Sequence, residues 1–415
     1  MRKKNNIYVI VFLFLYIYYP PLISINMIHI LAALSTFNMV VFYCNDKPIK
    51  LIMEIYFKNI IGYMCIAVSY LICILLVSNN ELITIYPYLI IIVEIPICVM
   101  YICLYFIKNK YDIYDVLNVL LTVGIIQAII ATLCFFIPSV KDIVINVFSK
   151  SLNRANQSSE LIYYMANVRL NGLSSNLTFT TPVVQTLLGL ISIHLALNKN
   201  FKYIVFFPIL FFSAVINARN SLIVLTYGMM ILVFMSVKKP KSILKLIFIS
   251  IVTIILTPIF VGMIKNSSEL VFKWISDGFD EIIKFFQGNN VGYFETVTNY
   301  FIRFPEGLQI IFGTGRRIFG LELGLGSDIG YINDLWLGGI IFTSISYITV
   351  EKFYIKGHKH QNKLVKFISL LFIFTFLILN IKGTIISNND FINFSFLLNT
   401  IFILDKKYQY FTAKN

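Results

Sequence analysis

The chain has 415 residues, of which 58% are hydrophobic and only 13% are charged, and its mean hydropathy is +0.81. Soluble domains carry about 25% charged residues, so this composition excludes an ordinary soluble globular protein and predicts an all-α, polytopic integral membrane protein. The formal net charge of +14 does not call for nucleic acid as a partner, because lysine and arginine accumulate in the cytoplasmic loops of membrane proteins.

Apolar stretches long enough to cross a bilayer of about 30 Å, or nearly so with their flanks, recur along the whole chain. The first, Ile7–Tyr19, follows three basic residues but is not followed by a small-residue cleavage site, so we expect a retained helix rather than a signal peptide. The stretches begin near residues 7, 24, 60, 83, 115, 177, 203, 219, 244, 329, 364 and 388. They predict a single polytopic domain over residues 1–415 with about twelve transmembrane helices.

Lysine and arginine are distributed differently between the two predicted sides of the membrane. With the N-terminus inside, 22 of the 34 basic residues fall in inner segments, and both termini are predicted to be cytoplasmic. Lysine dominates the inner side, whereas six of the seven arginines fall on the outer side. These six are Arg154, Arg169, Arg219, Arg303, Arg316 and Arg317. Arg219 stands out because it lies between two apolar runs, where a charge is costly.

Two outer segments are too long to be simple connections, 138–176 and 265–328. The second contains apolar residues every three or four positions from Val271 to Phe286, which predicts an amphipathic helix on the membrane surface or on the helix bundle. Ser267 or Ser268 is expected to cap it, and Gly288-Asn289-Asn290 to end it. A second helix is expected from Phe294 towards Ile302, with a break at Pro305.

The large outer segment closes with Gly313-Thr314-Gly315-Arg316-Arg317, a glycine-rich run to Gly326, and Ser327-Asp328-Ile329-Gly330-Tyr331. Glycines beside paired arginines suit a diphosphate, because the backbone can approach closely and guanidinium groups bind oxygens in a bidentate manner. The alternative is a flexible turn whose arginines lie at the lipid headgroups.

Other site chemistries find little support in the sequence. The six cysteines lie in or beside predicted helices, so neither a disulfide framework nor a cysteine-ligated metal site is expected. His358-x-His360 is interpreted as solvated surface in a lysine-rich inner loop. Tyr86 and Tyr88 are interpreted as belt or packing residues near helix ends. We expect neither a metal nor a cofactor.

Three short motifs lie at the starts of predicted helices on the outer side. Ser327-Asp328-Ile329-Gly330-Tyr331 enters a helix containing Gly338-Gly339, Asn217-Ala218-Arg219-Asn220-Ser221-Leu222 starts an earlier helix, and Arg169-Leu170-Asn171-Gly172 precedes another. Together with the large outer segment, they resemble the O-antigen polymerase and ligase superfamily. The resemblance spans about residues 169–347 and implies a GT-C-like membrane fold. Ligases of this superfamily depend on a histidine in the large outer loop, and this chain has none between His194 and His358. That departure favours the polymerase branch over the ligase.

The polymerase resemblance implies an enzyme of the bacterial inner (cytoplasmic) membrane that joins oligosaccharide repeat units linked to undecaprenyl diphosphate on the outer face. Its partners would be that lipid-linked substrate, the bilayer and a chain-length regulator protein, and not nucleic acid. We expect Arg169, Arg219 and Arg316 or Arg317 to bind the diphosphate, Arg303 to contact the glycan or the second lipid, and Tyr331 to bind substrate. The five arginines are expected to open onto one outer cavity beneath the large outer segment.

Asp328 is the first choice for the base that takes the acceptor proton, and Glu322 and Asp334 are alternatives. Asp328 could instead serve as the N-cap of the helix that follows. Glu94, a carboxylate deep in an apolar stretch, supports a rival hypothesis, a flippase for lipid-linked oligosaccharides, because intramembrane carboxylates in transporters couple protons.

Overall fold

All regular elements in the described part of the chain are helices. The computed structural model describes residues 6–22, 25–43, 47–152, 172–175, 179–217, 220–288, 295, 301–318 and 326–411. Within this part, all twelve predicted apolar stretches coincide with helices. Five helical spans are both long and apolar enough to cross a membrane: Pro48–Val77, Leu82–Lys108, Ile113–Phe136, Thr180–Asn198 and Pro240–Ser267. These spans are consistent with an integral membrane protein.

The contacts of the chain group into two compact units. Unit 1 comprises Met1–Leu31, Tyr111–Gly278 and Asn389–Phe394, and unit 2 comprises Ala32–Lys110, Phe279–Asn388 and Ser395–Asn415. Three helices contribute residues to both units: α2 (Met27–Tyr43), α14 (Glu269–Phe286), which lies mostly in unit 1, and α19 (Asp390–Tyr408). The remaining helices of unit 1 are α1 (Asn6–Tyr18), α7 (Ile113–Phe136), α8 (Pro138–Leu152), α10 (Thr180–Asn198), η4 (Phe201–Phe206), α11 (Phe207–Val215), α12 (Asn220–Ser236) and α13 (Pro240–Ser267).

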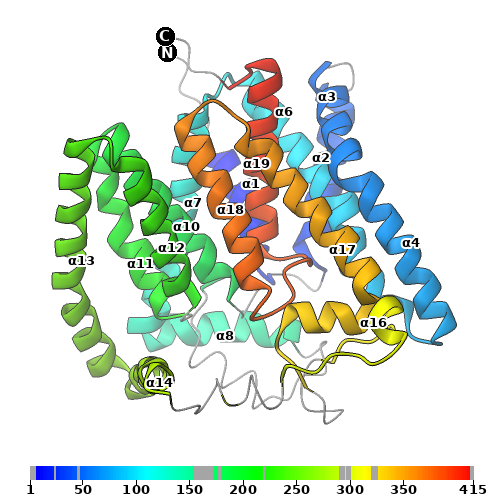
Figure 1. Cartoon of the computed structure of the whole chain (residues 1–415). Helices are drawn as coiled ribbons and strands as arrows, with labels where there is room; N and C mark the ends of the chain where they lie inside the picture. The colour runs from blue at the N-terminus through cyan, green and yellow to red at the C-terminus, as the bar shows by residue number, and fades with distance from the viewer. Residues whose placement is uncertain are drawn as a thin grey trace. The chain divides into compact units, whose positions relative to one another are not determined.

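Helix α10 forms the centre of unit 1. Its sequence contains no aspartate, glutamate, lysine or arginine, and a helix without a charged face is stable when other helices surround it. Every residue from Thr180 to Leu197 is buried. Helix α10 contacts α7, α11, α12 and α13, and α11 and α12 run beside it (Figure 1). Helix α12 packs closely against α10 at Gly228, which has no side chain. A Cβ atom there would lie only 2.2 Å from Leu190 Cδ1 of α10.

The amphipathic helix predicted in the large outer segment is confirmed as α14. The Ser268 hydroxyl accepts a hydrogen bond from the Val271 amide at 3.3 Å, so Ser268 caps the helix as one of the two predicted candidates. The helix ends at Phe286, before Gly288. Val271 is buried in a cluster with Phe135, Phe212 and Ile264, and Ile275 packs against this cluster. The apolar face of α14 therefore covers the ends of α7, α11 and α13.

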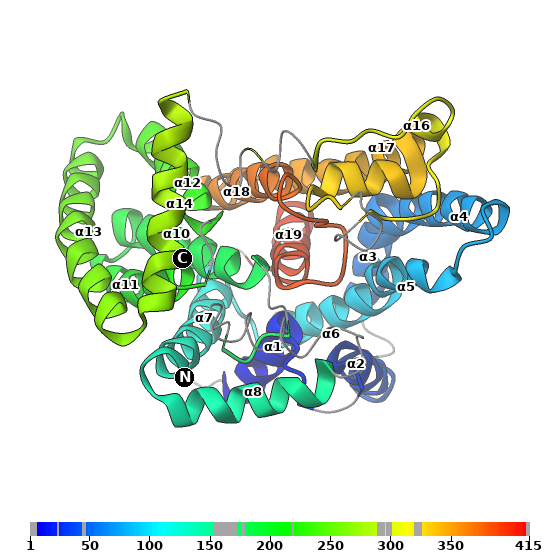
Figure 2. The ribbon, with the colours of Figure 1, turned by 90° about the horizontal axis from the view of Figure 1, so that it is seen from below.

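The segment 138–176, predicted to lie on the outer side, also contains a helix, which the sequence interpretation did not identify. Helix α8 begins at Pro138, directly after α7 ends at Phe136, and proline is favoured at this first position because it has no amide hydrogen to leave unsatisfied. Val140 and Val144 lie one turn apart and pack on the same cluster as α14. Helix α8 turns away from α7 and lies across its end (Figures 1 and 2).

Unit 2 contains two long apolar spans and a C-terminal group of helices. The first span is built from α3 (Lys47–Tyr56), η1 (Phe57–Ile61) and α4 (Gly62–Val77), and the second from η2 (Leu82–Ile85), α5 (Tyr86–Leu89), η3 (Ile90–Glu94) and α6 (Ile95–Lys108). The C-terminal group comprises α16 (Gln309–Phe312), α17 (Gly330–His358), α18 (Lys363–Leu379) and most of α19. Helix α17 packs against α4, α16 and α18.

Polar side chains also join the helices of unit 2. Asn399 in α19 donates its amide hydrogen to the Phe353 carbonyl of α17 at 2.7 Å, and Thr400 donates to the Tyr56 hydroxyl of α3 at 2.9 Å. In a bilayer, such hydrogen bonds between helices contribute about 1 kcal/mol each. They fix α19 relative to α3 and α17.

Candidate functional site

Helix α17 reverses direction at a glycine elbow. Gly339 has φ of 64° and ψ of −170°, which divides α17 into a first arm before it and a second arm after it. The Asp334 carboxylate lies 2.9 Å from the Tyr347 hydroxyl, although 13 residues of a straight helix would separate them by about 20 Å. The rings of Tyr331 and Tyr347 also meet, with centroids 5.2 Å apart. The sequence interpretation of one continuous helix from residue 329 is therefore wrong, because the Gly338-Gly339 pair folds the chain back on itself.

The Gly313-Thr314-Gly315 loop lies against this elbow, beside α16 (Figure 2). The Thr314 amide donates to the Trp336 carbonyl at 2.6 Å, and the Gly315 amide donates to the Leu337 carbonyl at 2.9 Å. These carbonyls belong to the end of the first arm, where helical partners are missing. A Cβ atom at Gly339 would lie 2.1 Å from the Ile311 carbonyl oxygen. The loop amides therefore bond within the protein, and the glycines provide close packing rather than a backbone cradle for a diphosphate.

The loop presents Arg316 to its surroundings. Arg316 is exposed, and its Nε donates to the Asn80 side-chain oxygen at 2.5 Å. The Asn80 amide nitrogen in turn donates to the Thr314 carbonyl at 2.9 Å. A neutral amide thus orients the guanidinium without neutralising it. The two terminal nitrogens of Arg316 form no hydrogen bond or ion pair with any other described residue.

Arg317 occupies a different environment from its neighbour. One of its terminal nitrogens donates to the Tyr88 hydroxyl at 2.6 Å and lies 3.2 Å from Asp334 Oδ1. Burial lowers the pKa of the Arg317 guanidinium, but the Tyr88 hydroxyl and the Asp334 carboxylate outweigh that effect and raise it above its usual value. Arg317 therefore stays charged and already has a carboxylate partner. The two adjacent arginines, which the sequence could not separate, have distinct environments.

Tyr88 was interpreted from the sequence as a belt or packing residue, and the structure shows a packing residue that also contacts Arg317. Its side chain is completely buried and its hydroxyl accepts the hydrogen bond from Arg317. Its ring also meets the Phe342 ring edge-on, with centroids 5.3 Å apart. Sequence alone did not reveal this role, because a tyrosine near a helix end looks the same whether it faces lipid or an arginine. Asn80 was missed too, although it falls on the same predicted outer side as Arg316.

Arg303, Asp328 and Tyr331 lie in or next to the first arm of α17. The Arg303 carbonyl accepts the indole hydrogen of Trp336 at 2.8 Å. The Tyr331 hydroxyl donates to the Leu377 carbonyl at 2.8 Å. Asp328 is half-exposed, and α17 begins at Gly330 with Ile329 in the N-cap position and no side-chain hydrogen bond there. The capping alternative for Asp328 is therefore not supported, and its role as a base stays a prediction.

Three further predicted site residues, Arg169, Arg219 and Glu322, lie outside the described residues, as does most of the helix predicted from Phe294. The segment just after Arg169 is described and is held within unit 1. The Ser174 hydroxyl donates to the buried Asp390 carboxylate at 2.8 Å, and the Ser175 amide donates to the Tyr18 carbonyl at 3.1 Å. The gathering of all the arginines around one cavity stays a prediction.

The two histidines of the predicted inner loop contact different groups of the protein. His360 Nε2 lies 3.0 Å from Asp405 Oδ2, and His360 Nδ1 accepts a hydrogen bond from the Asn362 amide at 3.0 Å. His358 contacts the Lys366 carbonyl instead. Among the described residues, no group of three or more histidine, cysteine, aspartate or glutamate side chains could hold a metal ion.

Comparison with known proteins places no further constraint on the site. No protein-family model, no curated protein and no solved structure matches the chain. The class of protein is therefore defined by the fold alone. In its described residues the chain is all-helical and has the apolar spans of a membrane protein.

Proposed function

We propose that the chain is a polysaccharide polymerase of the bacterial cytoplasmic membrane, with about twelve transmembrane helices. It would join oligosaccharide repeat units carried on undecaprenyl diphosphate at the outer face. The observation that carries the proposal is Arg316, an exposed guanidinium that Asn80 orients and that no carboxylate of the described residues neutralises. A fixed cation of this kind suits a diphosphate, because its free nitrogens can bind two oxygens at once.

The proposed reaction transfers a glycan between two lipid-linked units. A hydroxyl oxygen of the acceptor sugar attacks the anomeric carbon of the donor, the bond from that carbon to the phosphate oxygen breaks, and undecaprenyl diphosphate leaves with the bonding electron pair. Negative charge grows on the departing oxygen, so Arg316 would bind the transition state more strongly than the ground state. The proton of the acceptor hydroxyl passes to a base.

Arg317 and Asp334 are proposed to position the site rather than to bind substrate. Their ion pair joins the loop to the first arm of α17. Arg317 directly follows Arg316 in sequence, so the pair fixes the backbone that carries Arg316. Because Asp334 already contacts Arg317 and Tyr347, it is a poorer base than the half-exposed Asp328. This division of roles makes separate predictions for Arg316 and Asp328.

Replacing Arg316 is expected to abolish most polymerisation without unfolding the protein. Arg316→Gln should lower the rate of chain extension about 100-fold, the usual cost of removing one transition-state donor, and Arg316→Lys should recover only part because lysine lacks the fork. Polymer length in complemented deletion cells measures the effect. Lys265→Gln, which removes an exposed charge from the end of α13, is the matched control. Full-length polymer from Arg316→Gln at normal protein level would remove Arg316 from the mechanism.

Asp328→Asn is expected to stop chain extension while leaving thermal stability unchanged. The substitution is nearly isosteric and removes the proton acceptor, and Asp328 makes no capping bond whose loss would weaken α17. Extension by the purified variant and its unfolding temperature in detergent are the two readouts. Normal extension would transfer the role of base to another carboxylate.

A lipid-linked oligosaccharide flippase is the second candidate, and Glu94 supports it. Glu94 is a half-buried carboxylate that ends the π-helical turn η3 within the Leu82–Lys108 span, and π-helical turns often occur at functional sites. A deletion strain separates the candidates. Loss of long glycan, with a single repeat still reaching the outer acceptor, indicates a polymerase. Accumulation of untranslocated lipid-linked repeats indicates a flippase, and loss of all transfer indicates a ligase.

A further inference from the structure

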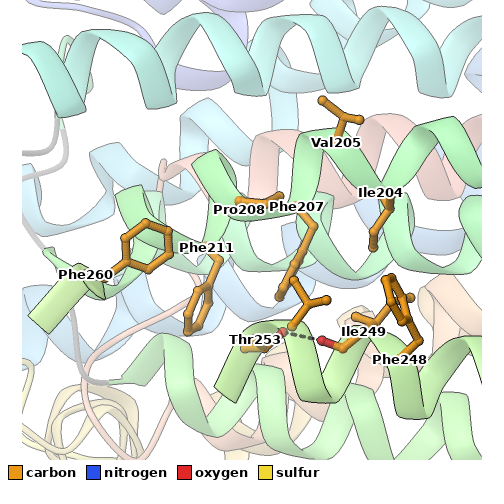
Figure 3. Close-up of a pocket in the computed structure, with 10 residues that line it drawn as sticks. Ile204, Val205, Phe207, Pro208, Phe211, Phe248, Ile249, Thr253 and Phe260 are labelled. Atoms are coloured by element: carbon orange, nitrogen blue, oxygen red, sulfur yellow. Dashed lines mark hydrogen bonds between the residues drawn. The ribbon is translucent and has the colours of Figure 1, made fainter. Parts of the chain in front are cut away.

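Unit 1 contains an apolar groove between two helical segments that start at the same end. One wall is formed by η4 and α11, and the other by α13 (Figure 3). The groove encloses a cavity of about 250 Å³. Its lining includes Ile204, Phe207, Phe211, Phe248, Val252 and Phe260. At one end the Phe260 ring closes against Phe212, with centroids 5.0 Å apart.

Among the described residues that line the groove, Thr253 alone is polar. Its hydroxyl donates to the Ile249 carbonyl at 2.8 Å, as Figure 3 shows, and so is not available to hold water. Apolar cavities without such groups stay dry and bind apolar molecules. Helix α13 is long and apolar enough to cross a membrane, and side chains near the groove such as Val205 and Phe248 are exposed. Hydrocarbon chains are therefore the natural contents of the groove.

Lysines mark the other end of the groove. Lys202 follows Phe201 in η4, and Lys241 and Lys245 lie in the first turns of α13. The Lys245 ammonium lies 5.8 Å from the centre of the Phe201 ring, and that ring lies 6.1 Å from the ring of Phe248 in the groove wall. None of the three lysines forms an ion pair with a carboxylate of the described residues. An apolar groove thus ends at uncompensated positive charge.

We propose that this groove binds an anionic glycerophospholipid, with one acyl chain between α11 and α13 and its phosphate at Lys202 and Lys245. Charge complementarity selects an anionic headgroup, since each lysine near a membrane surface adds attraction for acidic lipid. The lysine end is the side that the lysine distribution predicts to be cytoplasmic. A lipid donor that reacts at the outer face would present its diphosphate on the other side of the membrane. The proposed lipid site is therefore distinct from the proposed catalytic site.

Lipid retention by the purified protein tests the proposal. Native mass spectrometry would count phosphatidylglycerol and phosphatidylcholine molecules retained at equal added concentration. We expect preferential retention of phosphatidylglycerol and an affinity about fivefold weaker for each lysine removed, so about 25-fold weaker in Lys202→Gln/Lys245→Gln. The control Lys363→Gln/Lys366→Gln removes two exposed charges from α18 and should retain the lipid normally.

Filling the groove tests the acyl-chain half of the proposal. Val252→Trp places a large ring in the groove and should reduce phosphatidylglycerol retention, whereas Ile251→Trp changes an exposed neighbour outside the lining and should not. Equal retention of the two lipids by the wild-type protein, or unchanged retention by Val252→Trp, would overturn the proposal. Displacement of phosphatidylglycerol by equimolar undecaprenyl phosphate would also overturn it, by assigning the groove to polyprenyl lipid. The wild-type comparison decides the headgroup question even where a variant fails to fold.

Discussion

Gly339→Ala is expected to shorten the thermal half-life of the protein sharply and to abolish polymer formation. Gly339 adopts a φ of 64°, which costs a residue with a side chain about 1–3 kcal/mol. The added Cβ atom would also lie 2.1 Å from the Ile311 carbonyl oxygen, so the loop carrying Arg316 would have to move away from the elbow. Loss of folded protein on heating in detergent, followed by size-exclusion chromatography, measures the effect.

Gly262→Ala provides the matched control for this variant. Gly262 lies inside α13, and apart from its own helix turn and chain neighbours no atom of the described residues lies within 4 Å of the Cβ position. Alanine there reduces the freedom of the unfolded chain and should leave stability unchanged or raise it by about 0.4–1 kcal/mol. A Gly339→Ala protein with the half-life of the Gly262→Ala protein would mean that α17 does not turn back at this residue.

Asp334→Ala is expected to destabilise the protein by about 3 kcal/mol, because it leaves the Arg317 guanidinium without its carboxylate in a largely buried position. The Asp334 side chain is 1% exposed and that of Arg317 is 18% exposed, so the charge gains little relief from solvent. The free energy of unfolding, or the unfolding rate where unfolding is irreversible, is the quantity to measure. Tyr347 would also lose a hydrogen-bond partner.

The double variant Arg317→Met/Asp334→Ala separates the ion pair from its surroundings. Removing both charges eliminates the unpaired guanidinium, so the double variant should be more stable than Asp334→Ala alone, with a coupling energy of about 0.5–3 kcal/mol. Additive effects of the two single substitutions would show that the pair contributes nothing. Glu54→Ala and Lys58→Met break an exposed i,i+4 pair and should show little coupling.

The positions of the helices could be predicted from sequence, because they depend on long runs of apolar residues. Even the amphipathic α14 and its Ser268 cap follow from a local period and a local hydrogen bond. Helix α8 was missed since its apolar face is short, with Val140 and Val144 beside several polar residues. Local patterns therefore accounted for most of the fold but not for a helix with a narrow apolar face.

The arrangement around Arg316 and Arg317 could be predicted only in part. The pairing of Arg317 with Asp334 depends on the reversal at Gly339, and two glycines within an apolar run do not indicate whether the helix continues. The contacts with Asn80 and Tyr88 join residues more than 200 positions apart in sequence. Such contacts follow from packing, which no local pattern encodes.

Reconstitution with purified protein tests the central claim most directly. The protein in detergent or vesicles, given only undecaprenyl-diphosphate-linked repeat units, is expected to produce a ladder of longer lipid-linked glycans and to release one undecaprenyl diphosphate for each unit joined. The Arg316→Gln protein should produce almost no ladder under the same conditions. Absence of any extension by the folded wild-type protein, together with movement of the lipid-linked repeat across the vesicle membrane, would contradict the polymerase and support the flippase.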